Sequence, residues 1–234
     1  MGRHGHRVVL PRTACVVALV TLIATTPAAA RGFSAHVTNP WFPLKPGTTF
    51  VSIGAKDGRA ARDVFAVTHR TRRIDGARCI AVHDRLYLGG RLAERTTDYY
   101  TQDAHGTVWY FGDDTAELDA RGNVTSTEGS WRAGRDGGRA GIFMPAHPRV
   151  GERHRQELLR GHAEDHFQVV SLTAPVAVPY GTFSNALRTR EWTPLEPGVI
   201  DAKYYVRGIG QVSERSLRGG NERASLVRIL PARE

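Results

Sequence analysis

The sequence predicts an all-β protein, with a strongly curved antiparallel meander that forms an open or lipocalin-like barrel. Three observations favour this fold: apolar and polar residues alternate with period two from residue 48 onward, turn sequences recur along the chain, and amphipathic helical patterns are scarce. A meander of about eleven strands must curl or close to bury one face and protect its edges. A β-sandwich is the alternative architecture.

Short runs of strand-forming residues alternate with turn sequences in the first half of the chain. We expect strands at 63–69, 79–83 and 98–102. Turn sequences that contain glycine or aspartate, and therefore suit antiparallel hairpins, lie at 74–76, 88–91, 103–106 and 120–123.

The second half continues the pattern after an interruption. Residues 129–148 are rich in glycine and proline, so they predict a long loop, which is a candidate lid over the interior. A weak helical pattern covers 148–159. Further strands are expected at 153–159, 165–174, 182–192, 199–208, 211–217 and 224–230.

The first 30 residues have the composition of an export signal. A basic segment precedes an apolar run at 13–26, and small residues follow up to Ala30. The apolar run is shorter than the roughly 20 residues that a membrane-spanning helix needs. We therefore predict a signal peptide at 1–30 that is cleaved near Ala30, and a single secreted β domain at 31–234 without a transmembrane segment. The mature protein is expected to be secreted or to stay in the cell envelope.

The chain is basic, with 32 Lys and Arg against 23 Asp and Glu and a formal net charge of +9. Because the basic residues are dispersed, nucleic acid is not an expected partner. An arginine-rich module that binds anionic cell-wall polymer is one alternative function. After the leader is removed Cys79 is the only thiol, which excludes an intramolecular disulfide, and we expect it to be a small buried hydrophobe.

Three stretches of the sequence resemble a known group of proteins. They are NPWFPLKPGT at 39–48, YYTQD and GTVWYFG within 99–112, and YYVRGIGQV at 204–212. Together they resemble exported, mostly actinobacterial proteins of unknown function, and the last two are similar to stretches in the TapB-like open β-barrel group, which is akin to the LolA and LolB lipoprotein carriers. The resemblance implies a curved antiparallel sheet around an apolar cavity, and it implies no activity and no catalytic residue.

Aromatic residues in the predicted strands suggest a ligand site. As the lining of a cavity they suit a lipid or another apolar or amphipathic ligand. The leading hypothesis is therefore a secreted β-barrel that binds such a ligand or acts as an envelope accessory factor, with a large apolar pocket that lacks converging carboxylates. The candidate ligand-binding residues are Tyr99, Trp109, Phe111, Trp131, Trp192 and Tyr204.

A run of ionisable residues supports an alternative from another class, a secreted metal-dependent or carboxylate-dependent enzyme. In a strand, His162, Glu164 and His166 share one face and Asp165 takes the other. Two imidazoles and a carboxylate are the ligands of zinc and iron sites. The same run also suits a solvated strand start that pairs with nearby arginines.

The spacing of these residues limits the enzyme hypothesis. Positions i and i+4 of a strand lie about 13 Å apart, so a metal would need further ligands from elsewhere between 147 and 166. His162, Glu164 and Asp165 are the candidate catalytic residues, and a divalent metal is the candidate cofactor. The candidate metal ligands are His147, His162, Glu164 and His166, with His154 as a possible helper.

A second acidic group lies at Asp113, Asp114 and Glu117. Paired carboxylates of this kind serve calcium binding or acid–base chemistry, but adjacent residues point apart in a strand. We interpret Gly112 to Thr115 as a turn instead. The sequence has no glycine-rich phosphate loop and no nucleophile-elbow motif, so it predicts no cofactor-binding residues.

Overall fold

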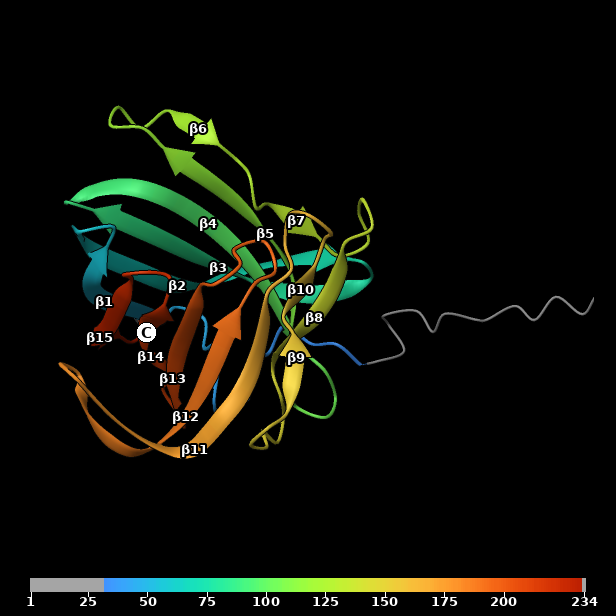
Figure 1. Cartoon of the computed structure of the whole chain (residues 1–234). Helices are drawn as coiled ribbons and strands as arrows, with labels where there is room; N and C mark the ends of the chain where they lie inside the picture. Colours follow the sequence, from blue (N-terminus) through green and yellow to red (C-terminus); the bar gives the residue numbers. More distant parts are fainter. Residues whose placement is uncertain (1–31, 233–234) are drawn as a thin grey trace, which may run out of the picture.

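The computed structural model describes residues 32–232, and the predicted signal peptide at 1–30 lies outside them. The described residues form one antiparallel sheet that curves strongly without closing, so the predicted all-β open barrel is confirmed (Figure 1). No helix in the described range has both the length and the apolar character to cross a membrane.

The strands follow one another in the chain with short connections. Their bounds are β1 (Thr49–Lys56), β2 (Arg59–Ile74), β3 (Ala77–Leu88), β4 (Arg91–Gln102), β5 (Val108–Leu118), β6 (Val124–Ser126), β7 (Trp131–Arg132), β8 (Arg139–Met144), β9 (Arg153–Arg155), β10 (Glu157–Leu158), β11 (His166–Val178), β12 (Gly181–Trp192), β13 (Ile200–Val206), β14 (Gly210–Arg218) and β15 (Arg223–Leu230).

The sheet is a meander in which most neighbours in sequence are also neighbours in space. Its order is β10-β8-β5-β4-β3-β2-β1-β15-β14-β13-β12-β11-β9, and β6 and β7 also pair with β5. Two predicted turns, at 74–76 and 88–91, are confirmed as tight hairpins. Asp75 and Gly76 connect β2 to β3 with φ of 44° and 78°, a combination that matches the twist of hairpin strands.

The two edge strands of the sheet, β9 and β10, are consecutive in the chain. β9 pairs with β11, β10 pairs with β8, and Gln156 alone separates β9 from β10. The backbone N–H of Gln156 donates to the carbonyl of Asp165 at 2.8 Å. The chain therefore crosses the gap between the sheet's edges at residue 156, which we call the seam, and Figure 1 shows β8, β9 and β10 together on this side of the barrel.

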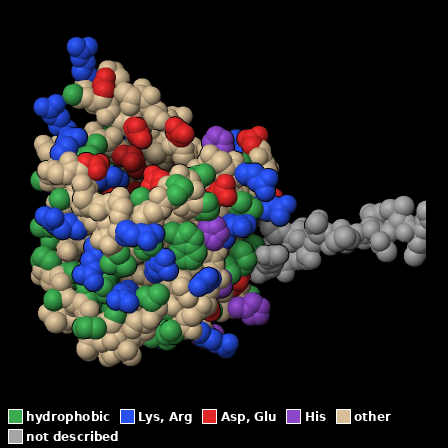
Figure 2. Space-filling model, viewed as in Figure 1, with side chains coloured by type: hydrophobic (Ala, Val, Ile, Leu, Met, Phe, Trp, Pro, Cys, Tyr) green, Lys and Arg blue, Asp and Glu red, His purple; other side chains and the backbone are tan. Residues whose placement is uncertain are grey.

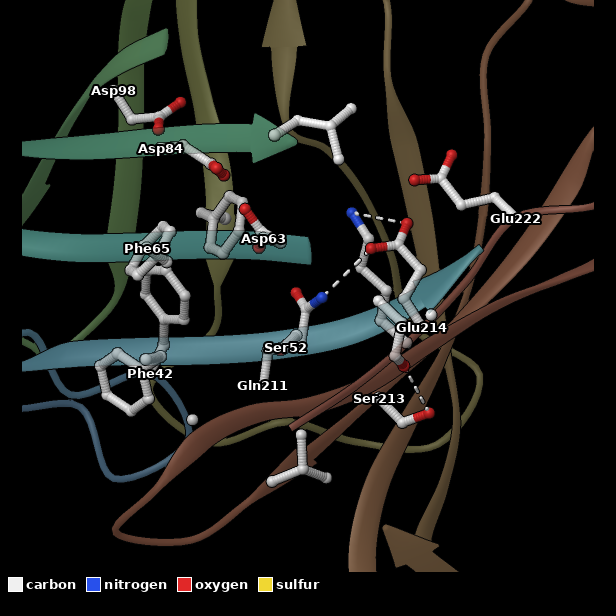
Figure 3. A pocket seen from close by; sticks show the side chains of 18 of the residues that line it. Phe42, Ser52, Asp63, Phe65, Asp84, Asp98, Gln211, Ser213, Glu214 and Glu222 are labelled. Atoms are coloured by element: carbon white, nitrogen blue, oxygen red, sulfur yellow. Dashed lines mark hydrogen bonds and ion pairs between the residues drawn. The ribbon is translucent and has the colours of Figure 1, made fainter. Parts of the chain in front are cut away.

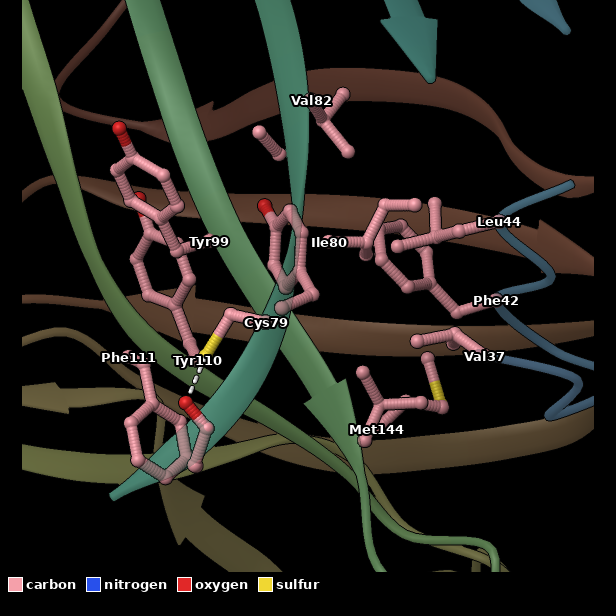
Figure 4. Packing of buried hydrophobic residues seen from close by; sticks show 14 of the residues in the cluster. Val37, Phe42, Leu44, Cys79, Ile80, Val82, Tyr99, Tyr110, Phe111 and Met144 are labelled. Carbon is pink, nitrogen blue, oxygen red and sulfur yellow. Dashed lines mark hydrogen bonds between the residues drawn. The ribbon is translucent and has the colours of Figure 1, made fainter. Parts of the chain in front are cut away.

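The segment before β1 packs onto the barrel and contributes to its core. Phe42 and Leu44 are buried in one cluster with strand residues such as Val82, Tyr110 and Met144 (Figure 4). The backbone N–H of Gly208 donates to the carbonyl of Pro40 at 2.7 Å, which ties this segment to the β13–β14 turn.

Cys79 lies in the same core, fully buried, as the sequence predicted. Its thiol donates to the carbonyl of Ala77 at 3.8 Å (Figure 4). Burial raises the pKa of the thiol to about 12, so it stays protonated and unreactive at neutral pH.

Three local predictions are wrong. Residues 129–148 are not one long loop, because they contain β7 and β8, whose backbones pair with β5. The weak helical pattern at 148–159 corresponds to β9 and β10, since pairing with β11 and β8 outweighs local preference. Gly112 to Thr115 is not a turn but continues β5 opposite β4.

Candidate functional site

The inner face of the barrel surrounds a cavity of about 420 Å³. Strands β1 to β5, β8, β10 and β13 to β15 line it, together with the segment before β1 and Gln156 of the seam. Figure 3 shows aromatic side chains on one side of its interior, and carboxyl groups together with other polar and aliphatic side chains elsewhere. A volume of this size is typical of small-molecule sites.

Strand alternation decides which side chains face the cavity. Asp63 and Phe65 on β2, Asp84 on β3, and Asp98 and Tyr100 on β4 all line it. The two residues of each same-strand pair are two positions apart, and side chains two apart in a strand point to the same side. The residues between them therefore face outward.

Aromatic rings form one part of the cavity wall, which we call the aromatic wall. Phe42, Phe65, Tyr100 and Phe143 belong to it. The ring centroid of Phe42 lies 4.5 Å from that of Phe143, 5.2 Å from Tyr100 and 6.1 Å from Phe65. Such packing gives a continuous apolar surface with the edge-to-face and tilted contacts that aromatic groups prefer.

Three aspartates form the adjoining part, the acidic wall: Asp63, Asp84 and Asp98. Figure 3 shows the carboxyl groups of Asp63 and Asp84 pointing toward each other, and they lie within hydrogen-bonding reach. Burial and the nearby charge of Asp84 raise the pKa of Asp63 to about 10. Burial likewise raises the pKa of Asp98 well above its usual range. At neutral pH Asp63 therefore keeps its proton unless a cation joins it.

A hydrogen-bonded chain continues from the acidic wall along β4 and β5. The Tyr110 hydroxyl lies 2.7 Å from Asp98 Oδ1 and 3.1 Å from Asp113 Oδ2, and the Thr115 hydroxyl donates to Asp113 Oδ1 at 3.0 Å. Thr115 in turn contacts Thr96 at 2.9 Å. Burial raises the pKa of Asp113 to about 6, although these hydroxyl groups favour its charged form.

The opposite side of the cavity has a cation, Lys203, beside Glu214, and Glu191 contacts the same cation without lining the cavity. Lys203 Nζ lies 3.0 Å from Glu191 Oε2 and 3.7 Å from Glu214 Oε1. Burial lowers the pKa of Lys203, but the two carboxylates outweigh burial and hold the pKa well above its usual value. Lys203 therefore stays charged and supplies one positive charge between the two carboxylates.

The seam brings a further carboxyl pair to the cavity. Trp131 Nε1 donates to Glu157 Oε2 at 2.7 Å. Burial, followed by the charges of Asp165 and Asp113, raises the pKa of Glu157 to about 8. Burial also raises the pKa of Asp165, although the charge of Lys203 opposes that shift.

The predicted cluster at 162–166 divides between two environments. Asp165 and His162 are both exposed, and of the two only Asp165 lines the cavity. Glu164 Oε1 accepts a hydrogen bond from the backbone of Gly161 at 2.7 Å. His166 Nδ1 lies 2.7 Å from the carbonyl of Glu164, and its ring stacks on Trp192 with centroids 5.6 Å apart.

The remaining candidate metal ligands lie apart from this cluster. His147 is exposed, and His154 Nε2 lies 3.7 Å from Glu152 Oε2. Within residues 32–232, no three His, Cys, Asp or Glu side chains are arranged to hold a metal ion.

The six predicted ligand-binding aromatics do not line the large cavity. Tyr99 faces outward, donates to Asp114 at 3.0 Å and has Arg132 over its ring at 4.4 Å. Trp109 lines a second, smaller hollow of about 270 Å³ beside His154. The remaining four predicted aromatics also do not line the large cavity: Phe111, Trp131, Trp192 and Tyr204.

The expectation of an apolar pocket without converging carboxylates is wrong. Sequence reasoning selected Tyr99, Trp109 and Phe111, whereas their neighbours Tyr100 and Tyr110 face inward. One available signal was the spacing of acids and apolar residues two apart, as in Asp63 with Phe65 and Asp98 with Tyr100, because such pairs share one face of a strand. This spacing indicates that the two side chains share one face of the strand, but it does not indicate whether that face is the inner one.

The outer surface has a different charge from the cavity. In the face shown in Figure 2, Lys and Arg side chains are scattered among hydrophobic and other residues, while Asp and Glu gather in its upper part. On β3 and β4 the outward-facing Arg85 and Arg95 are cross-strand partners. Carboxyl groups thus outnumber basic groups in the cavity, whereas basic side chains are spread over this outer face.

Comparisons with known proteins give two structural likenesses. No protein-family model matches this chain, and neither does any curated protein. A candidate exported protein with a YmcC-like fold from Bacteroides fragilis is 15% identical, with a TM-score of 0.48 over 83% of this chain and 100% of that one. A candidate lipoprotein from Parabacteroides distasonis is 10% identical, with a TM-score of 0.46 over 82% of this chain and 99% of that one. Neither likeness carries an argument about function.

Proposed function

We propose that this protein is an exported binding protein that holds an amphipathic ligand in its barrel. The observation that supports this most is the cavity of about 420 Å³, in which an aromatic wall adjoins an acidic wall. In this proposal residues 1–30 direct export, and residues 31–234 form one domain that works outside the cell or in the envelope.

The two walls suit the two parts of an amphipathic molecule. Phe42, Phe65 and Phe143 offer apolar surface for a hydrocarbon or ring system. Asp63, Asp84 and Asp98 offer hydrogen-bonding groups to a polar end. A wholly apolar lipid would leave these carboxyl groups facing hydrocarbon, at a cost in free energy. The amphipathic form of the ligand hypothesis is therefore the one we retain.

The two alternative hypotheses stay predictions. An enzyme that uses the 147–166 cluster would draw on Asp165, which lines the cavity, while His162 is exposed. A polymer-binding module would draw on outer arginines such as Arg85 and Arg95.

A fluorescent probe and one cavity-filling substitution test the proposal. Ser52 lines the cavity from β1 (Figure 3), so Ser52→Phe places a ring inside it. We expect the amphipathic probe N-phenyl-1-naphthylamine to bind the wild-type protein with increased fluorescence. Its affinity should fall at least tenfold in Ser52→Phe, because the ring occupies the probe's volume.

The matched control is Thr173→Phe, which adds the same ring at an exposed position of β11. This variant should bind the probe as the wild-type protein does. Absence of probe binding to the wild-type protein, or equal binding to Ser52→Phe and the wild type, would contradict the proposal.

A further inference from the structure

We infer that the ligand is a cation: an amphipathic amine whose ammonium group lies against Asp63 and Asp84, near Asp98, and whose apolar part lies on the aromatic wall. This inference rests on the proposed function and specifies the chemical class of the ligand. Three observations on the cavity support it.

The first observation is a difference between the two sides of the cavity. Glu191 and Glu214 have Lys203 as their cation, at 3.0 and 3.7 Å. Across the cavity, no ion pair with Lys, Arg or His reaches the acidic wall from the described part of the chain. The fold thus supplies a positive charge to Glu191 and Glu214. At the acidic wall it supplies none, so an external cation can take that place.

The second observation is an unsatisfied acceptor. Asp63 Oδ1 is buried from solvent and has no hydrogen-bond partner among the described residues. A buried polar atom without a partner costs free energy, so such atoms in folded proteins call for an explanation. An ammonium group carries three N–H donors and no acceptor, which suits a carboxyl pair such as Asp63 and Asp84.

The third observation is that the acidic and aromatic walls meet. Phe65 and Asp84 are cross-strand partners on β2 and β3, and both line the cavity. Tyr100 follows Asp98 by two positions on β4, so their side chains share the inner face. Figure 3 shows Phe65 and Phe42 beside Asp63. An ammonium group bound here would lie near the faces of aromatic rings, which also attract cations.

The other ligand charges fit less well. An anionic head group would be repelled by the carboxyl groups and would need them all to stay protonated. A neutral alcohol would leave no positive charge to offset the acids. The inference therefore predicts discrimination between ligands that differ only in their head group.

The experiment compares octylamine, octanol and octanoate by calorimetric titration at pH 7. At this pH the amine is protonated and the acid is ionised, because their pKa values lie near 10 and 5, as in lysine and glutamate side chains. We expect the wild-type protein to bind octylamine at least tenfold more tightly than either of the other two.

The double variant Asp63→Asn with Asp84→Asn removes both ionisable carboxyl groups with little change in shape. It should bind octylamine at least tenfold more weakly than the wild type, while its affinity for octanol is unchanged or higher. Retained octanol binding also shows that the variant is folded with an intact cavity. Asp136→Asn is the control, because Asp136 lies in an exposed turn with φ of 51°, which asparagine also adopts.

The outcomes separate the two proposals. Two results would overturn the cation inference: octanol or octanoate binds as tightly as octylamine, or the double variant binds octylamine as tightly as the wild type. The proposed function would still stand in either case if N-phenyl-1-naphthylamine binds. Failure of the naphthylamine probe and of all three octyl compounds to bind would overturn both.

Discussion

Two different devices stabilise carboxyl groups inside this barrel. Glu191 and Glu214 stay near a partly buried cation, Lys203. Asp63 and Glu157 instead have pKa values raised to about 10 and about 8, so near neutral pH they are held largely as neutral acids. Both devices avoid an isolated buried charge, which is among the most costly features a protein interior can contain. Only the second device, a raised pKa, leaves a carboxyl group that can exchange its proton for a bound cation.

The raised pKa values predict how stability depends on pH. In the unfolded chain Asp113 and Glu157 lose their protons near pH 4, whereas in the folded protein they do so near 6 and 8. Between these limits the folded state binds more protons, so the free energy of unfolding falls as pH rises. These two shifts amount to about 5 kcal/mol between pH 5 and pH 9. We therefore expect the thermal midpoint to fall by roughly 10–20 °C over this range, at about 2–4 °C per kcal/mol for a domain of this size.

Glu157→Gln tests the origin of this pH dependence. Glutamine retains an oxygen that accepts the hydrogen bond from Trp131 and has no proton to lose. The fall in midpoint between pH 7 and pH 9 should therefore be clearly smaller in this variant than in the wild type. The exposed substitution Glu128→Gln should leave the wild-type pH profile unchanged. A wild-type midpoint that rises with pH over this range would contradict the assignment.

Individual strands were largely predictable because alternation reports backbone conformation. The predicted segments 63–69, 79–83 and 98–102 lie in β2, β3 and β4. What alternation does not report is which face lies inside. Tyr99 and Tyr100 are adjacent aromatic residues of β4, and the choice between them depends on how the sheet curls. The predicted lining residue Tyr99 therefore lies on the outer face of β4, and its neighbour Tyr100 lies on the inner face.

One glycine has a role that only the pairing of β5 with β7 explains. Gly112 has φ of 123°, and a Cβ added to it would lie 2.2 Å from the carbonyl oxygen of Trp131. We expect Gly112→Ala to destabilise the protein by roughly 3 kcal/mol, from backbone strain of about 1 kcal/mol together with overpacking against β7. Chemical denaturation with urea measures this change.

Gly122→Ala is the matched control for that substitution. Gly122 also has a positive φ, of 83°, but a Cβ there would meet nothing within 4 Å. Its cost should be limited to the strain, about 1 kcal/mol. Equal losses of stability in the two variants would show that close packing between β5 and β7 contributes nothing.

At the scale of the whole molecule, the open barrel was predictable and the character of its cavity was not. The formal charge of +9 is a sum over the chain and contains no information on which residues face inward. The interior is acidic because Asp63, Asp84 and Asp98, on three neighbouring strands, all point to the inner face of the sheet. The seam at Gln156 was equally unpredictable, because it joins strands that pair with opposite ends of the sheet.

The most direct test of this account is a crystal structure of the protein with octylamine. We predict one molecule inside the barrel, with its nitrogen about 3 Å from a carboxyl oxygen of Asp63 or Asp84 and its alkyl chain against Phe42, Phe65 and Phe143. Octylamine seated only on the outer surface, with water filling the cavity, would contradict the account.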